Sequence, residues 1–323
     1  MKSIYSLAAL SLCLSSPGAL AQDPWPANRP IHLVVGYAPG GPVDTTARIF
    51  AKYLGDELNT SVVVENRPGA SGMIATQYVN RARPDGYTIS FVASPTLTIT
   101  PIIQGTQDLD LNNDLTYIGK LVDYTNVLVI NNDSGITTVG ELIDYAKAHP
   151  GEVSYASAGV GASNHLSAEL LSQRTHAPMN HVPYRGNAPA MVDVMSGNVL
   201  FMFDIISTAT NYIEGGKVRP LAVTSRERHS TLPDVPSMEE AGVDEYEVKG
   251  WYALAGPKQL PPAIVTTLHN ALTAIADNTD YQTAIAQAGY EIALTDGAGL
   301  QEIVHREYQL WDEVIKVAGI ETQ

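Results

Sequence analysis

Cysteine and basic residues are scarce in this sequence, and long apolar runs are missing. The 323 residues include one cysteine, Cys13, and 19 Lys and Arg against 34 Asp and Glu, which gives a net charge of −15. Such an acidic chain is a poor partner for nucleic acid or for an anionic membrane surface. No segment approaches the ~20 consecutive apolar residues that a membrane-spanning helix needs. We therefore expect a soluble mature chain with no direct membrane insertion.

The N-terminus has the order of parts that is typical of a secretory signal peptide. Lys2 precedes the apolar run 7–14, and small residues follow up to Ala21, after which we expect cleavage. Cleavage would remove Cys13, which follows Leu12 where a lipoprotein signal has a small residue. The mature chain would then have no thiol, disulfide or thiolate metal site, and a net charge of about −16. Its ~300 residues exceed what one hydrophobic core supports, so we expect two domains.

The segment 31–58 is the most informative part of the mature chain. An apolar strand at 31–36 leads into a Gly/Pro turn and then into a helix at 45–58. The first turn of a helix leaves backbone N–H groups free and has partial positive charge, so this segment can bind an anion. Gly40 and Gly41 let the chain approach a ligand, and Asp44 can cap the helix. The alternative is an ordinary structural connection between strand and helix.

Strands and helices alternate along the rest of the chain, which is typical of an α/β fold with doubly wound sheets. The helix at 73–83 has Ile74, Tyr78 and Ala82 on one face. Besides the first unit, we expect strands at 61–66, 87–93, 153–157, 180–184, 199–204 and 218–224, and helices at 73–83, 139–148, 164–173, 188–195, from 262 onward and at 299–317.

Two β-rich segments, 117–132 and 246–255, are long enough to cross between domains. We therefore expect two doubly wound α/β lobes joined by two crossing strands, with the last helix packed on the first domain. Domain 1 would comprise 22–124 and 248–323, and domain 2 would comprise 125–247. Such an architecture closes on a ligand by hinge motion.

A second strand–turn–helix segment, 157–165, can form the opposite side of a cleft. It offers the Gly159 and Gly161 N–H groups, the Ser163 hydroxyl and the His165 imidazole. The alternative is that Ser163 only caps the helix and His165 is a core histidine with its hydrogen bonds satisfied. A dinucleotide-binding turn is disfavoured because Asn164 stands where the third glycine of that motif belongs.

Further candidates lie at other predicted strand ends. Arg185, in the sequence Tyr184-Arg185-Gly186, can hold a carboxylate through two parallel N–H bonds or form a surface ion pair. Asp204 ends an apolar strand and can accept from a ligand or tie down the next helix. Ser71 and Ser94 each follow a strand and open a helix, as does the neighbouring Thr96.

Several separated motifs together strongly resemble the Bug-type solute receptors of tripartite tricarboxylate transporters, which have the periplasmic binding protein type II (Venus flytrap) fold. The similarity covers essentially the whole mature chain. The motifs are 29–31 leading to Pro-Gly-Gly-x-x-Asp at 39–44, Val-Glu-Asn-Arg-Pro-Gly-Ala at 64–70, Pro-Asp-Gly-Tyr-Thr at 84–88, Tyr-x-Ser-Ala-Gly at 155–159 with His165-Leu166, His-Val-Pro-Tyr-Arg-Gly at 181–186, Met-Phe-Asp at 202–204, Leu-Ala-Val-Thr-Ser at 221–225 and Leu-Pro-Asp-Val-Pro at 232–236.

The resemblance implies a periplasmic receptor that takes up a small organic carboxylate, a dicarboxylate or an aromatic acid, and delivers it to a two-subunit membrane permease. It also implies that the main chain of two facing turns, Ala38 to Asp44 and Ser157 to His165, holds one carboxylate, partly through bridging waters. Pro42 departs from the family pattern because proline has no N–H to donate. Tyr37 departs from it by adding a phenol that can stack on an aromatic acid.

Two other functions would use the same predicted surfaces. A ligand-sensing partner of a membrane kinase would have the same fold and pocket, and genes for a large and a small membrane subunit nearby would favour transport instead. A periplasmic serine hydrolase would use Ser71, Ser163, His165 or His181, but the sequence has no Gly-x-Ser-x-Gly or His-Glu-x-x-His motif. Turnover of an ester by the purified protein would favour the hydrolase.

We predict no catalytic residue, cofactor or metal. The predicted ligand contacts are Tyr37, Ala38, Pro39, Gly40, Gly41, Pro42, Asp44, Ser71, Ser94, Ser157, Gly159, Gly161, Ser163, Asn164, His165, Tyr184, Arg185 and Asp204.

Overall fold

The computed structural model describes residues 25–27, 29–104, 110, 113–184 and 186–320. The predicted signal peptide, 1–21, and Arg185 lie outside the described residues. Within the part that the structure describes, none of the helices combines the length and the apolar character needed to span a bilayer.

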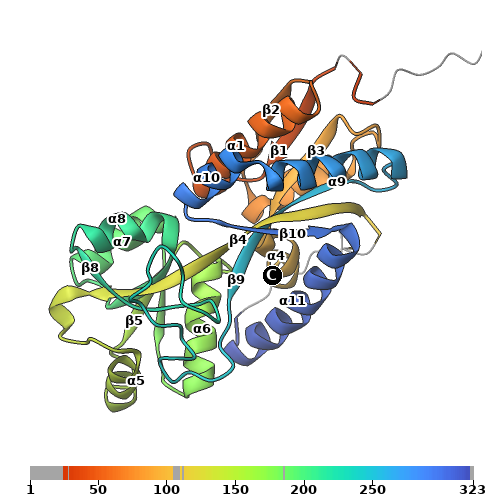
Figure 1. The fold of residues 1–323 in the computed structure, drawn as a ribbon. Coiled ribbons are helices and arrows are strands. Elements are labelled where there is room, and N and C mark those ends of the chain that lie inside the picture. The colour runs from red at the N-terminus through yellow and green to blue at the C-terminus, as the bar shows by residue number, and fades with distance from the viewer. Residues whose placement is uncertain (1–24, 28, 105–109, 111–112, 185, 321–323) are drawn as a thin grey trace, which may run out of the picture.

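One set of strands forms the first lobe, at the top of Figure 1. Strands β2 (Val62–Asn66), β1 (Ile31–Val35) and β3 (Thr88–Ala93) are parallel, and β9 (Lys249–Pro257) pairs antiparallel with β3. Four of the five β1 residues are buried because helices cover the parallel strands. The covering helices include α1 (Pro42–Glu57), α2 (Met73–Asn80), α9 (Pro262–Asp277) and α10 (Thr279–Gln287).

A second set of strands forms the second lobe. Strands β6 (Asn180–Pro183), β5 (Ser154–Ser157) and β7 (Phe201–Ile205) are parallel. Strand β8 (Val218–Val223) runs antiparallel to β4 (Leu115–Asn131). The helices of this lobe are α5 (Val139–Ala148), α6 (Ser163–Thr175), α7 (Asn187–Met195) and α8 (Ile206–Glu214).

Strand β4 belongs to both lobes and runs diagonally between them in Figure 1. Its residues from Leu115 to Thr125 pair with β9, and those from Asn126 onward pair with β7. The chain crosses back just before β9, where the Val248 N–H donates to the Thr224 carbonyl at 2.9 Å. The prediction of two α/β lobes joined by two crossing segments is confirmed.

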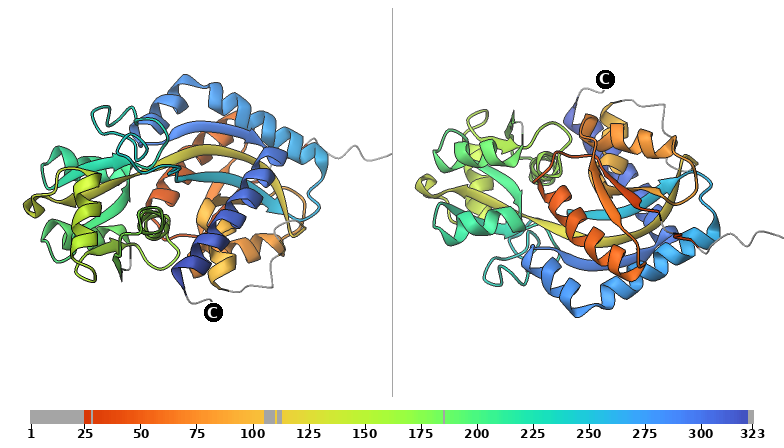
Figure 2. Two further views of the ribbon diagram at one scale, coloured as in Figure 1. Left: turned by 90° about the horizontal axis from the view of Figure 1, so that it is seen from below. Right: turned by 90° about the horizontal axis from the view of Figure 1, so that it is seen from above.

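The last helix, α11 (Gly297–Ala318), packs on the first lobe as predicted, and it also packs on the second lobe, which was not predicted. Leu300 and Val304 join the first-lobe core, whereas Trp311, Val314 and Ile315 join the second-lobe core. Gln173 of α6 donates to the Val314 carbonyl at 2.8 Å. At 22 residues the helix is long enough to span the junction. The left view of Figure 2 shows it along its length, in dark blue.

In α2, Ile74 and Tyr78 lie on one face of the helix, as predicted, but this face is the exposed one. Ile74 is 50% exposed and Tyr78 is 39% exposed, while Met73, Ala75 and Val79 are buried. Apolar residues occur on both sides of this short helix, so the periodicity alone did not identify the side that meets the sheet. The Arg67 guanidinium lies over the exposed Tyr78 ring, 3.6 Å from its centroid.

Several short elements have no counterpart among the predicted residue ranges. They are η1 (Ala70–Gly72), α3 (Ser94–Thr98), α4 (Thr100–Ile103), η2 (Asn132–Ser134), α8, α10 and β10 (Glu291–Asp296), which pairs antiparallel with β4.

Candidate functional site

Three turns of the first lobe meet at the carboxyl ends of its parallel strands. The Tyr37 hydroxyl, just after β1, lies 3.1 Å from the Thr96 hydroxyl and 3.3 Å from the Ser71 carbonyl. Thr96, just after β3, donates to the same Ser71 carbonyl at 2.8 Å. The structure thus brings the predicted residues Tyr37 and Ser71 together at the edge where parallel sheets bind ligands.

The Ser71 turn, residues 69–72, has an unusual backbone. Four consecutive residues, Gly69 to Gly72, have positive φ, with Ala70 at 47° and Ser71 at 49°. Left-handed backbone costs roughly 1–2 kcal/mol for each residue that is not glycine, and such strain often accompanies a functional site. At Gly72 a Cβ would lie 2.6 Å from the Thr96 hydroxyl, so only glycine fits there. The Tyr37 and Thr96 hydroxyls hold this turn in place.

The Pro39 turn, residues 38–44, leads into α1. Gly41 is the N-cap of α1 and Pro42 is its first residue, and the helix has no side-chain cap. The expectation that Asp44 caps the helix was therefore wrong. Its carboxylate instead accepts from the Gly40 N–H at 2.8 Å, from Arg48 through two bonds of 2.9 Å and from Asn66 at 2.8 Å.

The occupied Gly40 N–H changes which groups the Pro39 turn offers to an anion. Because Pro42 has no N–H, the remaining donors of the first helical turn are the Val43 and Asp44 N–H groups, which have no intrahelical acceptor. Arg48 pairs the Asp44 charge, so this acid does not repel an anion at the helix N-terminus. Residues 38–40 are exposed to solvent, as an entry to a binding site requires.

Asp44 should give the protein a measurable acid sensitivity. Burial alone would raise the pKa of Asp44, but hydrogen bonds from Arg48, Gly40 and Asn66 lower it to about 2. A carboxyl group with a lowered folded-state pKa stabilises the fold above its usual pKa, and this stabilisation is lost as the pH falls from about 4 to about 2. We expect Asp44→Asn to be less stable at pH 7 and to lose less stability over that window, measured by urea unfolding at each pH. Parallel pH curves for the two proteins would contradict this assignment.

The Gly159 turn, residues 157–165, lies at the carboxyl end of β5 in the second lobe. The Gly159 N–H donates to the Ser157 hydroxyl at 3.1 Å, and the Gly161 N–H donates to His165 Nδ1 at 3.1 Å. The expectation that these two amides are free was wrong, because side chains of the same turn accept from them. The N-cap of α6 is Ala162, so the alternative that Ser163 caps this helix was wrong as well. The Ser163 and Asn164 N–H groups open the helix and are its available donors.

A pair of stacked histidines contacts residues of the Gly159 turn. The His165 and His181 rings stack with centroids 3.8 Å apart, and the Ser157 hydroxyl lies 2.6 Å from His181 Nε2. Burial lowers the pKa of His165 to about 3, with a further contribution from His181, and lowers that of His181 to about 4. Both rings are neutral at pH 7. His165 is 2% exposed, which favours the alternative that it is a structural core histidine.

Asp204 supports the same turn through two asparagines. Its carboxylate accepts from Asn187, from the Ile205 N–H at 2.8 Å and from Thr208 at 2.8 Å. Asn187 accepts in turn from Asn164 at 3.2 Å, and Asn164 accepts from the Ala158 N–H at 3.2 Å. Burial raises the pKa of Asp204 to about 6. These partners favour the alternative that Asp204 ties down the following helix.

Tyr184 also has a partner within the protein, since its hydroxyl donates to Asp193 at 2.6 Å. Its N–H donates to the Ser157 carbonyl at 2.9 Å, so the main chain at 184 runs beside the Gly159 turn. The ligand roles predicted for Tyr184, Asp204 and His165 stay predictions.

The two lobes approach each other at this edge. The Tyr124 side chain, on β4, lies near the side chains of Ser94 in the first lobe and Ser163 in the second. On the other side of the Gly159 turn, a Cβ on Gly161 would lie 2.6 Å from Ile103 of α4. The Gly159 turn therefore lies against the segment of α3 and α4, whose Thr96 contacts the Ser71 turn.

Sequence reasoning missed four residues of this region, namely Tyr124, Thr96 as a holder of the Ser71 turn, His181 as a support, and Asn187. His181 lies within the predicted strand 180–184 and Asn187 follows it, so their positions were a usable signal. Tyr124 sits inside a long β-rich run, where a tyrosine is indistinguishable from a core residue.

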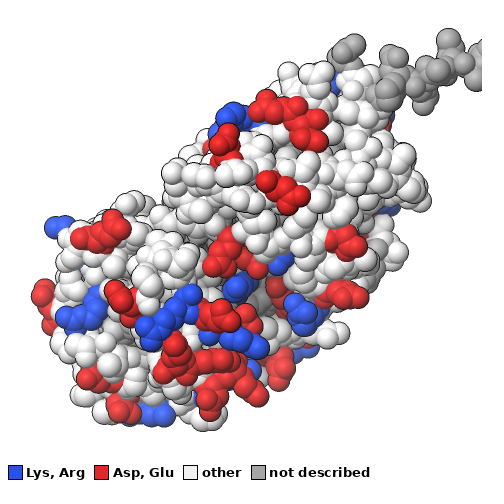
Figure 3. Space-filling view, viewed as in Figure 1, with Lys and Arg blue, Asp and Glu red and all other residues white. Residues whose placement is uncertain are grey.

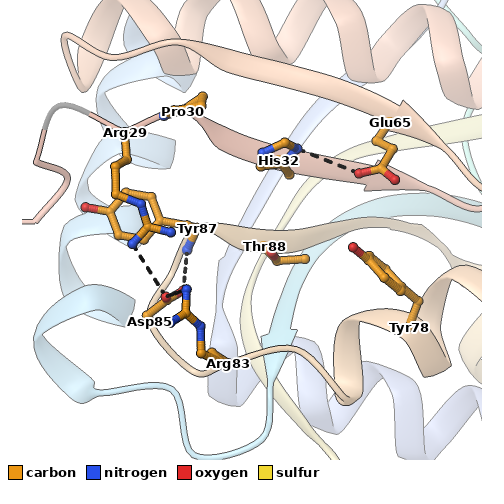
Figure 4. A pocket seen from close by; sticks show the side chains of 9 residues that line it. All are labelled: Arg29, Pro30, His32, Glu65, Tyr78, Arg83, Asp85, Tyr87 and Thr88. Atoms are coloured by element: carbon orange, nitrogen blue, oxygen red, sulfur yellow. Dashed lines mark hydrogen bonds and ion pairs between the residues drawn. The ribbon is translucent and has the colours of Figure 1, made fainter.

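A different cavity of about 270 Å³ lies at the opposite end of the first-lobe strands (Figure 4). Its charged side chains pair with one another: Asp85 lies 3.7 Å from Arg29 and 3.4 Å from Arg83, and His32 lies 3.7 Å from Glu65. Two guanidiniums thus share the one Asp85 carboxylate.

Surface charge does not single out another anion site on the face shown in Figure 3. Red and blue side chains alternate over its lower half, and several form ion pairs, such as Arg228 with Glu240 at 2.9 Å and Arg174 with Glu245 at 3.1 Å. Exposed charges are screened beyond ~8 Å at physiological salt. The local donors of the interlobe region are therefore decisive for an anionic ligand.

Comparison with known proteins identifies the relatives of this chain. A model of the tripartite tricarboxylate transporter family receptor (TctC) matches residues 46–320. Protein BugT of Bordetella pertussis is 32% identical over 317 residues, which are 97% of this chain and 97% of BugT.

Solved structures of the same kind superpose closely. A structure of Rpa4515 of R. palustris with adipate has a TM-score of 0.84 and 32% identity, over 93% of this chain and 100% of that one. The periplasmic binding protein BugD has a TM-score of 0.80 and 34% identity, over 92% and 100%. MatC of Rhodopseudomonas palustris with bound malate has a TM-score of 0.77 and 27% identity, over 88% and 98%.

Proposed function

The chain belongs to the tripartite tricarboxylate transporter receptor family, whose members and structural neighbours are solute-binding receptors, and on that premise we propose that it captures a small organic carboxylate between its two lobes. We further propose that it then delivers this ligand to a two-subunit membrane permease. The ligand would be a dicarboxylate or an aromatic acid.

The observation that carries the proposal is the placement of two helix N-termini, one in each lobe. Helices α1 and α6 both begin at the carboxyl end of a parallel strand, β1 in the first lobe and β5 in the second. Free first-turn N–H groups and the helix dipoles favour a negative group at such a point. A carboxylate held from both sides would also stabilise the closed arrangement of the lobes.

The two acids near the proposed site do not oppose the binding of a carboxylate there. The Asp44 charge is paired with Arg48, and Asp204 is buried among donors of its own lobe. Among the relatives, one neighbour is described with adipate and another with malate, which are aliphatic dicarboxylates. We therefore propose aliphatic dicarboxylates of similar length as the first ligands to test, with aromatic acids second because Tyr37 lines the first-lobe side.

A thermal-shift screen tests the proposal. The panel would contain C4 to C8 dicarboxylates, malate, citrate, terephthalate and related aromatic acids, with neutral sugars and basic amino acids as controls. A ligand that binds only the folded state at a hundred times its Kd stabilises the protein by about 2.7 kcal/mol, so a cognate acid should raise the Tm by several degrees. A clear shift with a sugar or a basic amino acid, and none with any acid, would refute a carboxylate receptor.

Export and delivery need tests in cells. We propose a periplasmic location after cleavage behind Ala21, and N-terminal sequencing of the exported protein should then begin at Gln22. Deletion of the gene should abolish uptake of the cognate acid, and deletion of the permease genes should have the same effect. Normal uptake without the permease would assign the receptor to another partner.

A further inference from the structure

Asn187 connects the Gly159 turn to the end of strand β7. It is the first residue of α7, whose N-cap is Gly186, and its side chain does not cap this helix. The Asn187 side-chain oxygen accepts from the Asn164 amide at 3.2 Å, and the Asn187 amide donates to the Asp204 carboxylate. We call the side chains of Asn164, Asn187 and Asp204 the Asn187 bridge. It joins the turn, helix α7 and the sheet of the second lobe.

The main chain of the Gly159 turn depends on the Asn164 end of this bridge. The Asn164 side-chain oxygen accepts from the Ala158 N–H at 3.2 Å and from the His165 N–H at 3.0 Å. Asn164 is 3% exposed, so water does not replace these bonds easily. With both ends of the turn held by one amide oxygen, the Ser163 and Asn164 N–H groups at the start of α6 remain as donors.

The order of donors and acceptors along the Asn187 bridge is fixed at both ends. A main-chain N–H can only donate, so the Asn164 oxygen must face Ala158 and the Asn164 amide N–H must face Asn187. Asn187 therefore presents its oxygen to Asn164 and its N–H to Asp204. Burial raises the pKa of Asp204 to about 6, so at pH 7 the group is mostly an ionised acceptor. The bridge thus specifies the orientation of both amides.

We propose that Asn187 is a ligand-positioning residue, which orients Asn164 and thereby holds the Gly159 turn in the shape that offers its free N–H groups to a carboxylate. Without Asn187, the Asn164 amide would lose the partner that sets its orientation, and the turn would have to be ordered by the ligand at a cost in affinity. Asn187 acts through Asn164 and not by contact with the ligand. This inference rests on the proposed function and adds to it a residue outside both turns.

Calorimetric titration of Asn187→Leu with adipate and with malate tests the proposal. Leucine has a similar branched shape and removes both hydrogen bonds of the asparagine, so the Kd should rise about tenfold. Thr208→Val is the matched control, because it removes another donor, at 2.8 Å, from the same Asp204 carboxylate. Its Tm should fall by a similar amount, but its Kd should stay within about twofold of the unsubstituted protein. Equal affinity of Asn187→Leu and the unsubstituted protein would overturn the proposal.

Two variants of Asp204 separate positioning from a purely structural role. The amide oxygen of Asp204→Asn still accepts from Asn187, whereas Asp204→Ala has no acceptor, so the first should bind about fivefold more tightly than the second. In an Asn187→Leu background this difference in Kd should vanish, because the acceptor then has no bridge to act through. If the difference persisted there, Asp204 would act only by holding α8, and the inference would be overturned.

Hydrogen exchange distinguishes failure of this inference from failure of the proposed function. If the unsubstituted protein binds neither acid, the dicarboxylate proposal fails, and the hold of the Asn187 bridge on the turn is then tested without ligand. The Ala158 N–H should exchange faster in Asn187→Leu than in the unsubstituted protein, because Asn164 no longer keeps its oxygen on that group. Thr208→Val should leave this exchange rate unchanged. Equal protection of the Ala158 N–H in Asn187→Leu and the unsubstituted protein would overturn the inference.

Discussion

A Gly41→Val variant should bind its carboxylate about a hundredfold more weakly and still fold. Gly41 has φ −80° and ψ 171°, an extended backbone that any residue adopts. The nearest atom to an added Cβ is the Ala38 carbonyl oxygen at 3.6 Å, so the protein has room for a side chain. A branched side chain at the N-cap would stand beside the Val43 and Asp44 N–H groups and exclude the ligand. Loss of two hydrogen bonds to a carboxylate corresponds to at least about a hundredfold in Kd.

The measurement is calorimetric titration with the best acid from the thermal-shift screen, together with urea unfolding of each variant. Valine is a poorer N-cap than glycine, so a stability loss of up to about 1 kcal/mol is expected. Gly140→Val is a matched control, because Gly140 lies exposed in the first turn of α5 and an added Cβ would meet only the Thr138 hydroxyl at 4.0 Å. That variant should bind normally. Binding by Gly41→Val within about threefold of the unsubstituted protein would place the ligand away from the Pro39 turn.

The order of elements was predictable from the sequence because buried parallel strands are apolar runs that Gly/Pro turns interrupt. β1, β5 and α5 begin or end within a residue of their predicted limits. The long β4 was recognisable by its length alone, since its 17 residues exceed the usual length of a strand within one lobe. Local signals of this kind need no knowledge of what packs against them.

Packing partners were not predictable in the same way. On α2, Ile74 and Tyr78 have the same spacing as residues on the buried side, and only the position of the sheet distinguishes the two faces. The C-terminal half of α11 buries Trp311 against α6, far away in sequence, and periodicity reports a buried face without saying which lobe covers it.

The turns that form the candidate site were predicted from the sequence, but the N–H groups that are free to donate in those turns were not. Glycines in a strand–helix turn indicate that the backbone can approach a ligand, and both turns lie at the interlobe edge. Whether their N–H groups are free depends on acceptors such as the His165 ring and the Asp44 carboxylate, whose direction the sequence does not specify. Donors therefore had to be reassigned to the first turns of α1 and α6.

A Gly250→Ala variant should lose about 3 kcal/mol or more of unfolding free energy. In an ordinary strand position, alanine would be slightly favourable, since glycine costs roughly 0.5–1 kcal/mol there. At Gly250 the new Cβ would overlap the Tyr124 ring, which Tyr252 and the first-lobe core hold in place. Overpacking against a group that cannot move costs about 1–3 kcal/mol and sometimes more. Urea unfolding measures the loss.

A second glycine of β9 provides a control for the stability loss expected of Gly250→Ala. At Gly256, also on β9, an added Cβ would lie 2.9 Å from the flexible end of Leu260, so Gly256→Ala should cost less than about 1 kcal/mol. A second comparison measures the effect of Gly250→Ala in a protein that lacks the Tyr124 ring. Tyr124→Ala alone already costs about 3–5 kcal/mol, because it leaves the space of the ring empty. In a Tyr124→Ala background the additional effect of Gly250→Ala should vanish, since the two changes act on one contact. If Gly250→Ala is equally damaging with and without the Tyr124 ring, the strain lies in the strand itself, and the ring is not held against β9.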